Sequence, residues 1–246
     1  EIMPSLVGSE MCIRDSHDTV VTINPAIYRS LNFAPSDLVP VVALANFNQM
    51  LVCAPASGLR TLDQLDAAAR KTPGSLSYAS GGQGVPGHLA MELYLAGAGL
   101  NVLHVPYKGP SPAAQDVLAG QVPCGFLASP VVASYVTAGK LNGLAVSGST
   151  RSTVAPDIPT MSQAGVAGYD ATFREMLFAP KGTPEAIVRR MNEEVARALA
   201  RPDVKRKLQA NDLDPLPQTP GDTARQLQED AAKWAAVVRK INLRVD

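Results

Sequence analysis

Glycine-rich turns alternate with short apolar runs over residues 75–113, and this stretch constrains the fold more than any other part of the chain. Residues 76–79 form an apolar run typical of a strand, and residues 81–87 then carry four glycines that permit tight turns. Pro86 suits the first turn of a helix, and apolar residues recur at helical spacing as far as Ala98. A second strand over residues 102–105 and a second glycine-containing loop complete a predicted βαβ unit.

This order of elements predicts an anion site. Each of the two loops follows a strand, and the first leads directly into a helix, so their backbone N–H groups would point toward one region. A helix N-terminus carries unpaired donors and a partial positive charge. A carboxylate is therefore the natural guest.

An α/β enzyme is the main alternative interpretation of the same loop. Residues 82–87 match the dinucleotide-binding pattern GxGxxG. That pattern also needs an acidic residue about 20 positions later for the ribose hydroxyls, yet no Asp or Glu lies between Glu92 and Asp116. Hydrolysis by Ser80 with His88 is a further possibility, but there is no GxSxG elbow and no histidine pair with metal-ligand spacing. We therefore expect no catalytic residues, no cofactor and no metal.

The composition argues against two other classes of function. The chain has 22 Lys and Arg and 22 Asp and Glu, so it lacks the basic excess of a nucleic-acid-binding domain. No run of 18 apolar residues could span a membrane. Cys12, Cys53 and Cys124 have neither CxxC nor metal-ligand spacing and do not reveal the compartment. We predict that Cys53 and Cys124 are small buried hydrophobic residues in strands.

The rest of the chain alternates predicted strands and helices, which favours parallel sheet pairing. Thr61 and Gln64 fit a capping box before a helix over residues 62–70, and Ser111 with Pro112 fits the start of a helix that ends near residue 118. Trp234 lies on the apolar stripe of the last helix and should belong to the core. Further strands are expected over residues 38–45, 49–54, 122–126, 144–147 and 173–178, further helices over 130–138 and from 184, 202 and 220, and a connecting segment over 150–168.

Several motifs occur in the order found in a known receptor family. They are YASGGQG at residues 78–84, HVPYKG at 104–109, GQV at 120–122, AGKL at 138–141, PDIPT at 156–160 and APKGTP at 179–184. With these motifs, residues 19–246 resemble the periplasmic solute receptors of tripartite tricarboxylate transporters, also called Bug receptors.

The resemblance implies an α/β fold of the two-domain, type II periplasmic binding protein class, a clamshell with hinge crossovers and an incomplete first domain. It places domain I at residues 17–56 and 171–246 and domain II at 57–170, with the solute between them. It also implies a periplasmic receptor that is not an enzyme. As a monomer without cofactor or nucleic acid, it would capture a small carboxylate solute and deliver it to a membrane permease.

The resemblance places one side of the solute site on three loops of domain II, where backbone amides and ordered water would hold the carboxylate. Ser80 is the favoured side-chain contact, and Lys108 would either neutralise the anion or remain solvated. His88 would contact the solute or bridge loop backbone, whereas His104 is expected to be structural. In full, the predicted contacts are Ser80, Gly81, Gly82, Gln83, Gly84, Val85, His88, Tyr107, Lys108, Gly109, Ala128 and Ser129.

Parts of the chain depart from the family pattern. Gln83 and Val85 stand where the family commonly has Asn, Thr or Ser, and Leu127 stands where Asp is common, so the solute's identity is not implied. Residues 1–16 fit neither the family nor a secretory signal and look like foreign sequence joined to a truncated receptor. Since the family has a strand and a ligand-contacting loop before Thr19, we expect this chain to bind its solute weakly and to be prone to aggregation.

Overall fold

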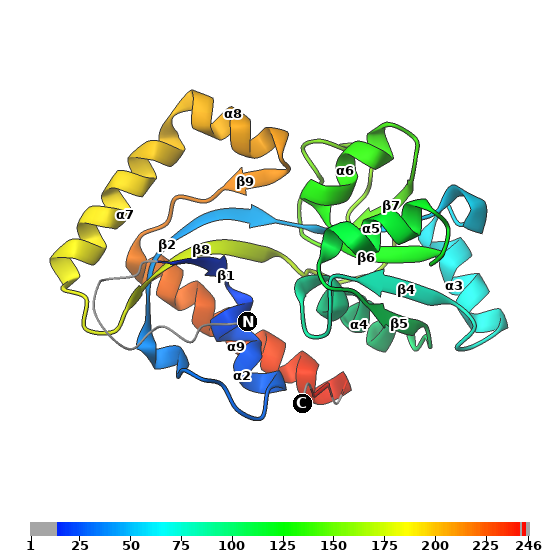
Figure 1. Cartoon of the computed structure of the whole chain (residues 1–246), viewed down its shortest axis with the longest axis horizontal. Coiled ribbons are helices and arrows are strands. Elements are labelled where there is room, and N and C mark those ends of the chain that lie inside the picture. Colours follow the sequence, from blue (N-terminus) through cyan, green and yellow to red (C-terminus); the bar gives the residue numbers. More distant parts are fainter. Residues whose placement is uncertain (1–13, 242, 245–246) are drawn as a thin grey trace. The chain divides into compact units, whose positions relative to one another are not determined.

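The structure is a computed structural model that describes residues 14–241 and 243–244 (Figure 1). Within that range the chain divides into two compact units. Unit 1 comprises the residues up to Asn46, Arg174–Leu208 and the residues from Asp214, and unit 2 comprises Phe47–Phe173 and Gln209–Leu213. The sequence predicted that the chain passes between the two domains after residues 56 and 170, whereas the unit boundaries lie after residues 46 and 173. No helix in the described part of the chain combines the length and apolar character needed to cross a bilayer.

Unit 1 contains a four-stranded sheet of order β1-β8-β2-β9, with β1 antiparallel to β8. The prediction that Trp234 belongs to the core is confirmed, since its side chain is fully buried. Residues 1–13 of the stretch predicted to be foreign lie outside the described residues, whereas residues 14–16 take part in β1. The elements are β1 Arg14–His17, α1 Thr19–Thr22, α2 Asn24–Ile27, the short 3-10 helix Pro35–Asp37, β2 Leu38–Phe47, β8 Phe173–Pro180, α7 Glu185–Ala200, α8 Pro202–Ala210, β9 Leu213–Pro215 and α9 Pro220–Ile241.

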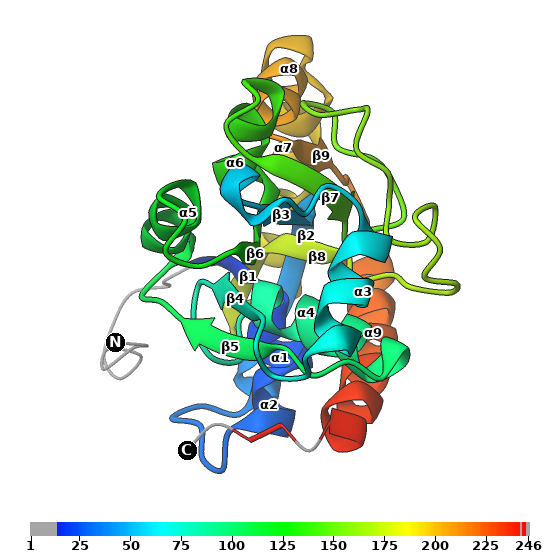
Figure 2. The ribbon, with the colours of Figure 1, turned by 90° about the vertical axis from the view of Figure 1, so that its right-hand side faces the viewer.

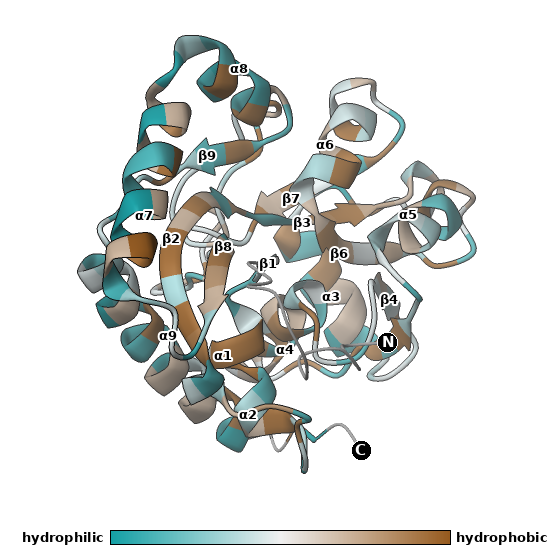
Figure 3. Cartoon of the chain, turned by 60° about the vertical axis from the view of Figure 1, so that its left-hand side comes forward, coloured by the Kyte–Doolittle hydropathy of each residue, from teal (hydrophilic) through white to brown (hydrophobic). Residues whose placement is uncertain are grey.

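Strand β8 sends alternate side chains to the two faces of the unit 1 sheet. Leu177 packs with Val188 of α7, whereas Met176 and Phe178 pack with Leu227 of α9. The two helices therefore cover opposite faces of this sheet. In Figure 3 the exposed side of α7 is largely hydrophilic and β2 is largely hydrophobic, as expected for amphipathic helices on a buried sheet.

A buried charge cluster joins β8 to α1 and α9. Arg174 Nη1 lies 3.6 Å from Asp18 Oδ2 and is also paired with Asp230 of α9. Asp18 occupies the N-cap position of α1, where its carboxylate accepts no helix N–H, and it is 1% exposed. Burial raises the pKa of its carboxyl to about 7, although the nearby guanidinium of Arg174 opposes the shift. One cation thus serves two carboxylates and fixes the start of α1 within unit 1.

Unit 2 contains a five-stranded sheet of order β5-β4-β6-β3-β7 (Figure 2). The strands predicted over residues 76–79, 102–105, 122–126 and 144–147 all form, each within two residues of its predicted limits. The segment from residue 150 to residue 168 is irregular, as predicted. The elements are β3 Gln49–Cys53, the 3-10 helix Pro55–Ser57, α3 Leu62–Lys71, β4 Ser77–Ser80, α4 Pro86–Ala98, β5 Leu103–Pro106, α5 Pro110–Leu118, β6 Cys124–Ala128, α6 Ser129–Thr137 and β7 Asn142–Val146.

The prediction of a parallel sheet is wrong for β3. Strand β4 pairs parallel with β5 and β6, but β3 is antiparallel to both β6 and β7. Strands joined through a crossover helix run in the same direction, as β6 and β7 do on either side of β3. Strand β3 follows β2 almost directly, without such a helix, so this rule does not fix its direction.

Cys53 and Cys124 form a disulfide, which corrects the prediction that they are separate small hydrophobic residues. Their location in strands and their burial were predicted correctly. The two residues are register partners on β3 and β6, with Cα atoms 4.0 Å apart. They are separated by 71 residues in the sequence, and β3 enters the sheet out of chain order, so spacing alone could not pair them.

The start of α3 is held by the residue that the sequence indicated. Thr61 Oγ1 accepts a hydrogen bond from Gln64 N at 3.3 Å, as an N-cap residue does. Gln64 Oε1, however, accepts from Arg60 N rather than from Thr61 N. The predicted capping box is therefore only half formed.

The two glycine loops differ in how they start a helix. Helix α4 begins at Pro86, as predicted. Helix α5 begins at Pro110, two residues before the start predicted from Ser111 and Pro112. Gly109 is its N-cap with φ of 114°, a conformation that residues with a side chain rarely adopt, and this explains the earlier start.

Gly87 allows α4 to lie directly on β6. A Cβ atom at this position would be 2.1 Å from Phe126 O and 3.2 Å from Gln49 Oε1. The third glycine of the dinucleotide pattern serves the same close packing of helix on strand. The match to GxGxxG thus has a packing explanation that requires no nucleotide.

We predict that Gly87→Ala lowers the free energy of unfolding by about 3 kcal/mol, because the added methyl would force α4 away from β6. Gly97→Ala is the matched control in the same helix: nothing lies within 4 Å of its Cβ position. It should raise stability by about 0.5–1 kcal/mol through better helix propensity. Urea unfolding measures both, and equal effects would contradict the proposed close packing.

We predict that reducing the Cys53–Cys124 disulfide lowers the free energy of unfolding by about 4 kcal/mol, since the bond closes a long loop in the unfolded chain. Unfolding with and without a reductant measures the difference. A thiol assay in denaturant should find two fewer thiols before reduction than after it. An unchanged thiol count would show that the bond does not form.

Candidate ligand-binding site

The three loops predicted from the sequence meet at one edge of the unit 2 sheet. They follow the adjacent strands β5, β4 and β6, which run parallel and so end at the same edge (Figure 2). Open α/β sheets bind ligands at the carboxyl ends of their parallel strands. The predicted contacts on these loops are therefore neighbours, although they are up to 49 residues apart in the chain (80 to 129).

The first two loops are hydrogen-bonded to each other. Tyr107 N donates to Ser80 O at 3.0 Å, and Gly109 N donates to Gly81 O at 2.9 Å. A Cβ on Gly82 would lie 3.2 Å from Tyr107 O. Glycine is thus needed because the two backbones touch, and the pair of loops forms a single surface.

Three helices begin at this edge, and none has a side-chain cap. The N-cap residues of α4, α5 and α6 are Val85, Gly109 and Ala128, and no side chain of theirs accepts a helix N–H. Such helix ends carry partial positive charge, although the prolines in these three first turns have no N–H to donate. The edge is therefore suited to an anion.

Several loop amides point away from internal acceptors. Across the described residues of the two loops, the backbone N–H groups of Gly81, Gln83, Val85 and Lys108 have no intramolecular hydrogen-bond acceptor. The Gln83 and Lys108 residues are exposed, and Gly81 and Val85 are half-buried. These donors can hold a carboxylate without a charged side chain.

The polar groups at Ser129, on the third loop, face the protein interior. Ser129 is fully buried; its N–H donates to Asn48 O at 2.9 Å, and its hydroxyl donates to Asp212. Of this loop, only Ala128 is half-exposed next to the other two. The polar groups of Ser129 are thus committed to the protein interior.

Asp212 is a residue that the sequence analysis missed. Its Oδ1 accepts hydrogen bonds from Ser152 Oγ at 2.8 Å and from Thr153 N at 2.7 Å, while its Oδ2 accepts from Ser129. Its φ is 57°, which Asp tolerates better than most residues. Its position just after helix α8 was a local sign of a helix end, but nothing in the sequence indicated its distant partners.

Ser80 and His88 lie together, but not as a nucleophile and its base. Ser80 is fully buried, and its hydroxyl donates to Gly82 O at 2.9 Å. His88 Nδ1 accepts a hydrogen bond from Gly84 N at 2.9 Å. His88 thus bridges loop backbone, the second of its two predicted roles, and Ser80 is not accessible to a substrate carbonyl.

The side chains of Tyr107 and Lys108 point to different partners. The Tyr107 hydroxyl donates to Asp116 at 2.6 Å on α5, and burial together with this hydrogen bond raises the pKa of Tyr107 to about 12. The Lys108 side chain is exposed. Among the described residues, no group of three or more His, Cys, Asp or Glu is arranged to hold a metal ion.

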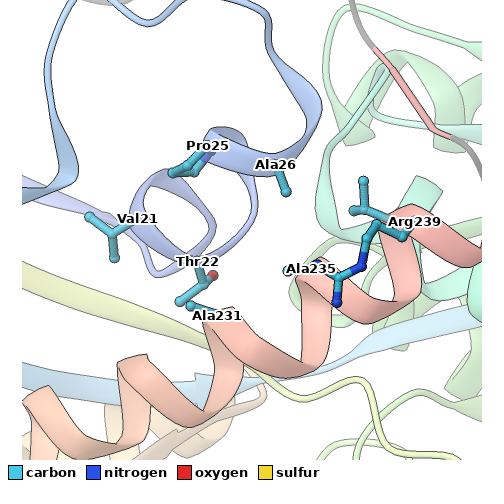
Figure 4. Close-up of a pocket in the computed structure, with 8 residues that line it drawn as sticks. Val21, Thr22, Pro25, Ala26, Ala231, Ala235 and Arg239 are labelled. Carbon is cyan, nitrogen blue, oxygen red and sulfur yellow. The ribbon is translucent and has the colours of Figure 1, made fainter.

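Two apolar hollows in unit 1 do not involve these loops. One pocket of about 390 Å³ in unit 1 is lined by residues of α1, α2 and α9, including Arg239 (Figure 4). A second of about 330 Å³ shares Val21 and Ala231 with it. None of the predicted contacts lines either pocket. The evidence for a binding site at the loop edge is therefore its hydrogen-bond donors.

The comparison with protein families agrees with this geometry. The sequence profile described as tripartite tricarboxylate transporter family receptor matches residues 11–243. The chain belongs to this receptor family. The family resemblance inferred from the motifs is confirmed. The matched range begins at residue 11, within the stretch 1–16 that was predicted to be foreign to the family.

Curated relatives are about one-third identical to this receptor over the aligned residues. A UPF0065 protein from the tcbD-tcbE intergenic region of Pseudomonas sp. strain P51 is 35% identical over 208 residues, and BugT of Bordetella pertussis is 33% identical over 204. The alignments cover 84% and 83% of this chain but only 62% and 63% of the relatives. The chain thus spans less than two thirds of their length.

Solved structures of receptors have the same fold. Rpa4515 of R. palustris, solved with adipate, has a TM-score of 0.87 at 28% identity and covers 94% of this chain and 77% of its own. MatC of Rhodopseudomonas palustris, with bound malate, has a TM-score of 0.81 at 27% identity and covers 92% of this chain and 78% of its own. The periplasmic binding protein BugD has a TM-score of 0.85 at 23% identity. The predicted periplasmic binding protein-like fold is confirmed.

We predict that Asp212→Ala lowers the free energy of unfolding by about 3–5 kcal/mol, because the hydroxyls of Ser129 and Ser152 and the Thr153 amide would lose their acceptor in a buried place. Asp212→Asn keeps one acceptor oxygen and tolerates the positive φ, so it should lose about half as much. Urea unfolding at neutral pH compares the two. Equal losses would show that the carboxylate acceptors do not matter.

Proposed function

We propose that this receptor captures a small carboxylate-bearing solute in the periplasm and delivers it to the membrane permease of a tripartite tricarboxylate-type transporter. It acts without catalysis and without a cofactor. The observation that carries the proposal is the edge of unit 2, where uncapped helix N-termini and unpaired loop amides face the same region.

Backbone donors explain why an anion would be preferred. A carboxylate accepts hydrogen bonds through two oxygens, and charge-assisted bonds to N–H groups are shorter and stronger than neutral ones. Gly81, Gln83, Val85 and Lys108 supply such donors within two loops that are bonded to each other. We propose these four amides as the primary contacts, with the Lys108 ammonium as a secondary one.

The remaining predicted contacts would shape the site rather than bind the solute. The side chains of Ser80, His88 and Ser129 are already hydrogen-bonded inside the protein. Gly82, Gly84, Tyr107, Gly109 and Ala128 set the course of the backbone and leave it accessible. All of the predicted positions thus have a role in the site: four bind the solute, and the others hold or shape the loops.

Two further observations support the receptor assignment. The similar structures of Rpa4515 and MatC were solved with dicarboxylates, namely adipate and malate. The Cys53–Cys124 disulfide fits an oxidising compartment such as the bacterial periplasm. The ligands of the similar structures support the ligand class that the loop geometry favours, and the disulfide supports the proposed compartment.

A ligand screen tests the proposal. Adipate, malate and their neutral diamides would be titrated calorimetrically into the chain, with NAD and ATP as controls. A dicarboxylate should bind and its diamide should not, since the loop amides favour negative charge. Binding of NAD alone would contradict the proposal and favour the enzyme alternative.

We predict that Gly84→Val weakens dicarboxylate binding by at least about tenfold, because a side chain at φ of 70° would displace the loop and several of its amides together. Lys108→Ala should weaken it by less than about fivefold, as expected for an exposed charge. Gly139→Val is the matched control: it has φ of 67° but lies at the far end of α6. The reverse ranking of Gly84 and Lys108 would show that side-chain charge holds the anion.

A further inference from the structure

Two histidines are stacked directly beneath the glycine loop. The rings of His88 on α4 and His104 on β5 are 3.9 Å apart between centroids and 8° from parallel. The ring of Tyr78 on β4 continues the stack, 4.9 Å from His104. His88 is 4% exposed, and His104 is half-buried. None of these rings belongs to the amide contacts proposed above.

His88 reaches back from the first turn of α4 to the loop that precedes it. Its Nδ1 accepts the Gly84 N–H at 2.9 Å in a buried setting. A ring nitrogen can accept only when it carries no proton, so the neutral ring has its proton on Nε2. That nitrogen lies 3.9 Å from Glu92 Oε1. If His88 were charged, its Nδ1–H would face the Gly84 N–H, and these two donors would have no acceptor between them.

His104 holds the other end of the loop through Ser80. Its Nε2 lies 2.7 Å from Ser80 Oγ, and Ser80 Oγ in turn contacts Gly82 O and accepts from Gly82 N. A hydroxyl has one proton, so two arrangements satisfy these contacts: His104 Nε2–H donates to Ser80 Oγ while the hydroxyl donates to Gly82 O, or the hydroxyl donates to an unprotonated Nε2. The two rings thus hold Gly82 and Gly84, whose φ angles are 147° and 70°.

The surroundings of the stack oppose positive charge. Burial lowers the pKa of His88 to about 3, with a further contribution from the neighbouring imidazole, and burial lowers the pKa of His104 to about 4. The titratable groups that face the pair are Tyr78 and Glu92, and Tyr78 donates its hydroxyl to Glu92 at 2.9 Å. Burial also raises the pKa of Glu92. Strands β6 and β3 of the same sheet place Phe126 O and Gln49 Oε1 next to Gly87 of α4, and neither residue titrates.

We propose that His88 and His104 are positioning residues: as an uncharged stacked pair they hold the glycine loop in the conformation that presents its free amides to the solute. This inference rests on the proposed function for its effect on binding, but not for its effect on the loop. The pKa of each histidine is lower in the folded chain than in an unfolded one. The stability that the neutral pair gives to the loop is therefore fully present above about pH 6.5 and is lost as the pH falls toward the folded pKa values of about 3 and about 4.

The loop is tested first, without any solute, by nitrogen-15 NMR of the whole chain from about pH 8 to about pH 2.5, a range that includes the titration of both rings. At pH 7 the neutral His88 should show a bare Nδ1 and a protonated Nε2. The Gly84 amide signal should shift with the same midpoint as the His88 ring. A protonated Nδ1 at pH 7, or a Gly84 signal that ignores the titration of His88, would overturn the proposal.

Two variants of His88 then separate positioning from packing at neutral pH. His88→Asn keeps an acceptor near the place of Nδ1, whereas His88→Gln moves it to the place of Nε2. The Asn variant should keep the Gly84 amide shift and bind adipate within about threefold of the original chain, and the Gln variant should lose the shift and bind about tenfold more weakly. Equal losses in both would mean a packing role only and would overturn the inference.

The two proposals fail in different ways. If the original chain binds neither adipate nor malate at any pH, the proposed function fails for these solutes. The Gly84 amide shift in the two unliganded variants still decides whether His88 holds the loop. If the His88→Gln variant loses the Gly84 amide shift and still binds adipate with the affinity of the original chain at pH 7, the function stands and the positioning role is wrong.

Discussion

The close approach of backbone to backbone at one sheet edge is the constraint on which the rest of unit 2 depends. Strands β5, β4 and β6 end together; the loops after β4 and β5 touch at Gly81 and Gly82, and α4 lies on β6 at Gly87. Because hydrogen-bond donors of the main chain are then brought to the surface, the edge can bind an anion with few charged residues. The same requirement explains a match to the dinucleotide pattern in a chain whose family consists of receptors.

The interior beneath this edge is polar, and its groups are arranged to hold the loops rather than to react. Ser80 and His88 form hydrogen bonds to loop backbone, His104 is hydrogen-bonded to the Ser80 hydroxyl, and Asp212 accepts a hydrogen bond from Ser129 at the start of α6. A buried polar group costs free energy unless it is paired, so each of these side chains is stable only in one loop conformation. Binding sites made of amides need this support, since a loop amide has no side chain to direct it.

Sequence patterns predicted local structure well and distant pairing poorly. The start of α4 at Pro86, the N-cap at Thr61 and the burial of Trp234 depend on neighbours within one or two helical turns, and all were confirmed. The disulfide of Cys53 with Cys124 and the ties of Asp212 depend on strand order and on chain segments far apart in sequence. Strand β3 is antiparallel to its neighbours because it enters from β2 without a crossover helix, a fact of topology that no periodicity records.

By itself, the sequence determined the family, the α/β class and the three loops that carry the candidate site, because glycine and proline positions and ordered motifs are local properties of the chain. Only the tertiary structure decided which groups on those loops are free to bind. It turned the hydroxyls of Ser80 and Ser129 inward and left the amides of Gln83, Val85 and Lys108 unpaired. The physical reason is that a donor's availability depends on whether an acceptor lies within about 3 Å of it, and most such acceptors come from residues distant in the sequence.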